Sequence, residues 1–141
     1  MDTLLPAAPA VPARARRPRL TLWGLRLVTA LHLCAVLVQP LLAGRFLTGD
    51  VDAIGLHGAV GLLVVLSGLV LAVTALGYVA VVRGRWWLVP VAAALFLAEG
   101  LQLGMGTARA LQVHVPLGVA ITVTATLLAG WAWSPAARRP Q

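Results

Sequence analysis

Four long apolar runs, separated by short polar or glycine-rich links, constrain this chain more than any other feature. The first extends from Leu20 to about Ala43, and the others cover about Val51 to Val82, Trp86 to Leu103 and Ala110 to Trp133. A helix of about 20 residues crosses the hydrocarbon core of a bilayer. Because a helix also satisfies its own backbone groups in lipid, the runs predict an all-α membrane protein, with a bundle of four transmembrane helices in residues 20–133.

The composition fits a chain that lipid solvates. Of 141 residues, 60% are hydrophobic and only 11% are charged, far from the balance of a soluble domain. The formal charge of +7 comes from arginines clustered between the apolar runs, so we interpret them as topology signals and expect the bilayer, and no nucleic acid, as partner. Basic residues that are all arginine, with abundant Ala, Leu, Val and Gly, indicate a bacterial chain in the inner (plasma) membrane.

The positions of the arginines predict the orientation. They gather in the N-terminal segment, in the Arg83–Arg85 turn and in the C-terminal tail, and such segments face the cytoplasm. We therefore expect both termini inside the cell, with residues 1–19 a disordered basic tail and residues 134–141 a second cytoplasmic tail. Indole rings favour the membrane interface, and five of them fall at the predicted cytoplasmic ends: Trp23, Trp86, Trp87, Trp131 and Trp133.

A short motif occurs twice near the predicted outer ends of the second and fourth runs. His57-Gly-Ala-Val-Gly61 is followed later by His114-Val-Pro-Leu-Gly118, and on a helix positions i and i+4 share a face. Gln39…Gly44 and Gln102…Gly106 also match at the outer ends of the first and third runs. These matches predict two pseudo-repeated helix pairs, which place His57 and His114 at one depth on facing helices.

Two histidines at one depth indicate a cofactor. Two neutral imidazoles can bind haem iron from both sides, and bundle cofactors are held by side chains of facing helices. In this interpretation His57 and His114 are the axial ligands of one haem b, while Gly61 and Gly118 leave room for the ring. Arg45 and Arg109 lie near the outer interface and suit the haem propionates, because a guanidinium binds both carboxylate oxygens.

These residues resemble the four-helix, bis-histidine bundle that forms each half of haem A synthase, and more loosely the small dihaem membrane cytochromes b. The resemblance covers about Leu25 to Trp133 and implies that His57 and His114 form a haem-ligating pair on the outer side of the membrane. In the catalytic half of that family an acidic residue precedes the second-helix histidine by three positions, and here that position is Ile54. The loop cysteines of many bacterial members are also absent, so the resemblance is to a cofactor-holding half and does not extend to haem A synthesis.

Two further polar residues fall inside the predicted spans. Glu99 lies about five residues from the outer end of the third span, close to the expected level of the two histidines. Because an unpaired carboxylate in lipid costs several kcal/mol, we expect it to face the bundle, either protonated or bonded to a neighbour such as Arg109 or a histidine. His32 lies about six residues deeper and is expected to form an interhelical hydrogen bond. Either residue is also a candidate proton relay.

The first hypothesis for function is a membrane cytochrome that passes electrons to or from a quinol or a periplasmic redox protein near the outer face. The alternative is a cofactor-free small transporter, or an accessory or structural membrane subunit, in which Glu99 binds protons or stabilises the bundle. No catalytic residue is assigned, and the sequence leaves open both a catalysed reaction in a redox or haem-handling system and assembly into an oligomer or larger complex.

Overall fold

The computed structural model describes residues 17–138, and within that range the chain is helical, without strands. The backbone hydrogen bonds of the apolar runs are satisfied inside each helix, as lipid requires. The helices are α1 (Arg17–Leu47), α2 (Asp52–Val82), α3 (Leu88–Thr107) and α4 (Leu111–Trp133), followed by the short 3-10 helix η2 (Pro135–Arg138). The predicted four-helix architecture is confirmed.

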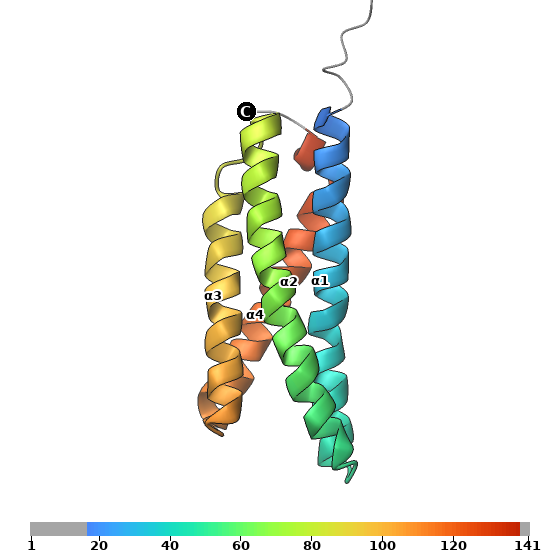
Figure 1. The fold of residues 1–141 in the computed structure, drawn as a ribbon, viewed down its shortest axis with the longest axis vertical. Coiled ribbons are helices and arrows are strands. Elements are labelled where there is room, and N and C mark those ends of the chain that lie inside the picture. The colour runs from blue at the N-terminus through green and yellow to red at the C-terminus, as the bar shows by residue number, and fades with distance from the viewer. Residues whose placement is uncertain (1–16, 139–141) are drawn as a thin grey trace, which may run out of the picture.

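The helices form a closed ring of antiparallel neighbours (Figure 1). α1 packs on α2, α2 on α3, α3 on α4 and α4 back on α1, so α2 and α4 are diagonal and run in the same direction. We call the end with the 48–51 and 108–110 links the hairpin end. The opposite end, with the start of α1, the 83–87 link and η2, is the terminal end. Figure 1 shows the α1–α2 and α3–α4 hairpins diverging toward the hairpin end.

All four helices are long and apolar enough to cross a membrane, as in a multi-pass membrane protein. Their candidate spans contain 28, 31, 20 and 23 residues, and about 20 residues suffice. Large aliphatic side chains cover the outside, with Leu97 and Leu127 each 68% exposed, whereas Ala75, Ala92 and Ala132 are fully buried. Small residues inside let the helices approach closely, which is how membrane helices pack.

Two helices continue past the ends that the sequence predicts. α1 extends to Leu47, four residues beyond Ala43, and α3 extends to Thr107, four residues beyond Leu103. Hydropathy shows only where the apolar residues end. The helix itself can continue into polar residues as long as its backbone hydrogen bonds are formed. The tail predicted for residues 1–19 lies outside the described residues up to position 16, and Arg17–Arg19 already belong to α1.

Polar and aromatic contacts close the ring at the terminal end. The buried Arg26 donates from Nε to the Ala132 carbonyl of α4 at 3.0 Å, and its guanidinium lies over the rings of Trp23 and Trp133 at 5.1 and 5.3 Å. The last carbonyls of a helix carry partial negative charge, so a cation there is favourable. Arg26 thereby fixes α1 to the end of α4.

The segment after α4 is also anchored at this end. Tyr78 of α2 is fully buried and donates its hydroxyl to the Ala137 carbonyl of η2 at 2.7 Å. Its ring packs edge to face on Trp131, with centroids 6.1 Å apart. A buried tyrosine hydroxyl needs a partner, and η2 supplies it.

Candidate functional site

His57 and His114 come together between the diagonal helices α2 and α4. Their ring centroids lie 6.1 Å apart and their planes are inclined at 60°. His57 Nδ1 is 3.1 Å from the Gln39 carbonyl of α1, and His114 Nδ1 is 2.9 Å from the Gln102 carbonyl of α3. Each histidine is therefore held by the first helix of its own hairpin, in the same way in both hairpins.

These contacts determine the tautomer of both rings. A backbone carbonyl can only accept a hydrogen bond, so Nδ1 of each histidine carries the proton and donates. In a neutral imidazole Nε2 is then the lone-pair nitrogen. A metal-bound histidine has this state, with its other ring nitrogen donating to a carbonyl or carboxylate.

A cavity of about 400 Å³ opens beside the two rings and extends toward the middle of the bundle. Its volume falls in the range of small-molecule and cofactor sites. Residues of all four helices line it, most of them apolar: Val36, Gln39, Pro40, Ala43, His57, Val64, Gln102, His114, Val115, Gly118, Val119, Ile121, Thr122 and Val123. Within residues 17–138 no three His, Cys, Asp or Glu side chains cluster as ligands of a bare metal ion, so the histidine pair offers two ligands.

The two glycines of the repeated motif contact glutamine side chains. A Cβ at Gly118 would come within 2.8 Å of Gln102 Nε2, and one at Gly61 would lie 3.4 Å from a Leu103 methyl group and 3.9 Å from Gln39 Nε2. Of these two glycines only Gly118 lines the cavity. The space above it is thus taken by the Gln102 amide, whose Oε1 is buried and has no partner among the described residues.

The two arginines expected near the propionates lie at the hairpin end and do not line the cavity. Arg45 pairs with Asp50 across the first link, and its side chain is 56% exposed. Arg109 lies in the second link with a φ of 56°.

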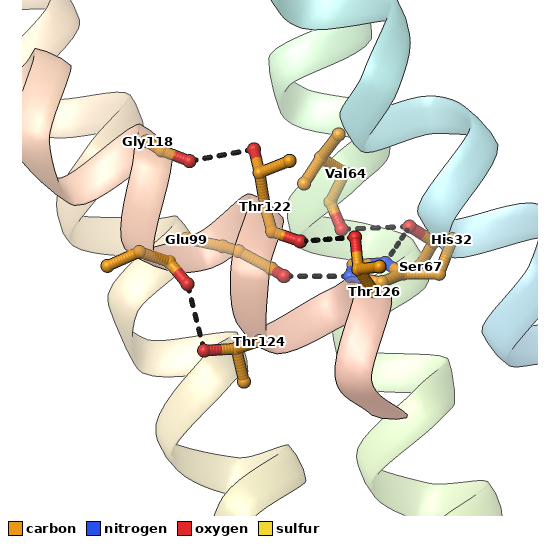
Figure 2. A network of polar contacts seen from close by, with 9 residues as sticks. His32, Val64, Ser67, Glu99, Gly118, Thr122, Thr124 and Thr126 are labelled. Atoms are coloured by element: carbon orange, nitrogen blue, oxygen red, sulfur yellow. Dashed lines mark hydrogen bonds and ion pairs between the residues drawn. The ribbon is translucent and has the colours of Figure 1, made fainter. Parts of the chain in front are cut away.

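A second polar cluster crosses the interior on the terminal side of the cavity (Figure 2). His32 Nε2 of α1 lies 3.0 Å from Glu99 Oε1 of α3, with both side chains at most 1% exposed. His32 Nδ1 contacts Ser67 Oγ of α2 at 2.9 Å, and Ser67 donates to the Val64 carbonyl. The interhelical hydrogen bond expected of His32 is confirmed, and it has a carboxylate as a second partner.

Glu99 faces the bundle and bonds a histidine, as expected, but not at the level of His57 and His114. Its carboxylate meets the deeper His32. Because α3 continues to Thr107, Glu99 lies eight residues from the hairpin end of its helix and not five. Helical side chains also lean toward the N-terminus, which on α3 points away from the hairpin end.

Three partners in these sites carry no signal in the sequence. Every residue has a backbone carbonyl, so the sequence does not indicate that the carbonyls of Gln39 and Gln102 accept these hydrogen bonds. It shows only that glutamine recurs at both positions. Ser67 resembles any other small residue of a membrane helix. Gly68 makes room for the pair, since a Cβ there would overlap Glu99 Oε2.

No family model, curated protein or solved structure matches this chain.

Proposed function

We propose that this chain is a membrane cytochrome that binds one haem b between His57 and His114. One observation carries the proposal: two imidazoles from diagonal helices come together at the wall of a cavity, each with Nδ1 bonded to a backbone carbonyl. In the neutral state each Nε2 offers a lone pair to a shared metal. Bound haem would supply one-electron chemistry, while the protein provides ligands, burial and orientation.

The spacing of the rings supports two-sided ligation. Two imidazoles that each bind one ion at about 2 Å have their ring centroids about 6 Å apart, and the observed separation is 6.1 Å. The largely apolar lining suits a porphyrin, and the Gln102 amide is the group that has to turn away from Gly118 for a ring to enter. Arg45 and Arg109 lie at the hairpin end and are the cations nearest in sequence to the two His-x-x-x-Gly motifs. They are therefore the proposed partners of the haem propionates.

The location of the proposed haem site follows from the proposed topology. Arg83, Arg85 and Arg138 lie at the terminal end together with the tryptophans, and this charge favours a cytoplasmic location. The histidine pair then lies near the outer face of a bacterial inner membrane, within reach of a quinol or a periplasmic redox protein. The matching His–carbonyl contacts in the two hairpins support the proposal of two pseudo-repeated helix pairs.

Absorption spectroscopy tests the proposal. The chain is produced with ample haem supply, purified in mild detergent and measured oxidised and dithionite-reduced. Sharp reduced bands of low-spin, six-coordinate haem b are expected, and His57→Ala or His114→Ala should abolish them. Glu99→Gln is the control, because Glu99 does not line the cavity. Colourless wild-type protein, or full binding by both alanine variants, would refute the proposal.

The buried His32–Glu99 pair favours one alternative, a cofactor-free transporter or accessory subunit. Ionisable residues in a membrane interior are costly to bury and commonly mark a functional site. In that case Glu99→Gln is the damaging change, and His57→Ala leaves function intact.

A further inference from the structure

We propose that His32 and Glu99 form a proton-binding site that takes up one proton when the haem site is reduced. This inference rests on the proposed function, to which it adds a second ligand, the proton. It is carried by the hydrogen-bond directions of the pair, by the scarcity of other charges around it and by its position next to the cavity.

The hydrogen-bond directions determine how many protons the pair holds. Ser67 donates its hydroxyl proton to the Val64 carbonyl, so its Oγ accepts from His32 Nδ1. We place one proton in the 3.0 Å gap between His32 Nε2 and Glu99 Oε1, and the pair is then electrically neutral whichever partner holds it. Glu99 Oε2 has no hydrogen-bond partner within residues 17–138 and is the acceptor for a second proton.

Few other charges act on the pair. Glu99 is the only titratable residue of α3, and α4 has only His114. α2 contributes the uncharged Ser67 and Gly68. On α1 the next charged residue toward the terminal end is Arg26, six positions from His32 and bonded to the end of α4. The protonation of the pair therefore responds mainly to charge that enters the cavity.

The pair lies about one helical turn from the cavity lining. Gln102 lines the cavity and follows Glu99 by three residues on α3, while Val36 lines it and follows His32 by four residues on α1. Residues three or four apart share a helix face. Val64, whose carbonyl anchors Ser67, is also in the lining. The side chains of His32 and Glu99 are buried and the cavity lining is mostly apolar, so the low dielectric couples the charges of the two sites strongly.

The charges balance in the proposed step. A quinol or redox protein delivers one electron, which adds one negative charge to the cavity. The neutral pair takes one proton from water at Glu99 Oε2 and becomes a His32 imidazolium beside a protonated Glu99. Oxidation reverses both changes.

Potentiometry against pH tests this coupling. One proton per electron makes the equilibrium constant for reduction fall up to tenfold for each unit rise in pH. We expect the equilibrium constant of the wild type to approach this tenfold change per pH unit over part of the pH range. In Glu99→Gln the equilibrium constant should change less than about twofold per pH unit. Asp52→Asn, the same acid-to-amide change at the exposed start of α2, should keep the wild-type slope.

Infrared difference spectroscopy provides a readout that does not depend on the haem bands. Reduction should change the carbonyl band of the protonated Glu99 carboxyl group, as a new band if His32 held the shared proton or as a shift if Glu99 held it, and Glu99→Gln lacks this signal. If Glu99→Gln does not fold, His32→Gln replaces it in the comparison of pH slopes, because it removes the titrating ring and leaves the carboxyl group. Equal pH slopes in wild type and variant, or no carboxyl band, would overturn the proton site and leave the haem assignment standing, whereas absent haem bands in the wild type overturn both.

Discussion

A single methyl group added at Gly68 tests how firmly the His32–Glu99 pair is held. Gly68 is buried on α2 against the Glu99 carboxylate. An added Cβ would overlap Oε2 and lie 3.0 Å from Cδ. Gly68→Ala therefore forces the carboxylate to move, and this movement separates it from His32.

Two opposing effects set the size of the change in unfolding free energy. Breaking a buried ion pair costs about 3–5 kcal/mol, because a charged or polar group remains buried without its partner. Alanine is favoured over glycine within a helix by about 1 kcal/mol. The expected net loss of stability is therefore about 2–4 kcal/mol.

Gly77→Ala is the matched control on the same helix. A Cβ at Gly77 would meet nothing within 4 Å, so this change should be neutral or stabilise by up to about 1 kcal/mol. Reversible unfolding in detergent micelles with increasing sodium dodecyl sulfate, followed by circular dichroism, gives both values. In a Glu99→Ala background Gly68→Ala should lose its cost, because the methyl group then has space.

A result within about 0.5 kcal/mol of the Gly77→Ala value would refute this reasoning, since that margin is the usual error of additivity. It would mean that the carboxylate turns aside and keeps its contact with His32. A loss that persists in the Glu99→Ala background would instead assign the cost to backbone packing between α2 and α3.

Two further substitutions test the contacts at the terminal end by the same unfolding assay. Arg26→Lys removes the planar guanidinium that bonds Ala132 and stacks on two indoles, so we expect a loss of about 1–3 kcal/mol; an unchanged unfolding midpoint would show that charge alone suffices. Tyr78→Phe removes the hydroxyl that bonds Ala137 and leaves that carbonyl buried without it, so a loss of about 1–3 kcal/mol and faster proteolysis after α4 are expected. Equal proteolysis rates in variant and wild type would contradict this anchoring.

The sequence by itself determined the four helices and the residues that carry the candidate site. Hydropathy reports which solvent a segment requires, and runs of about 20 apolar residues leave only a membrane-spanning helix. The repeated His-x-x-x-Gly motif predicted that His57 and His114 come together, and they do. The role of this pair as haem ligands stays a prediction.

Only the tertiary structure decided which side chains face each other and where the helices end. In a soluble helix the apolar stripe marks the buried face, but here lipid is as apolar as the interior and both faces carry aliphatic residues. The rotation and tilt of each helix are then set by packing of small residues such as Ala92 and Gly68. For this reason the sequence alone did not pair Glu99 with His32, and their contact appears only when four helices close into a ring.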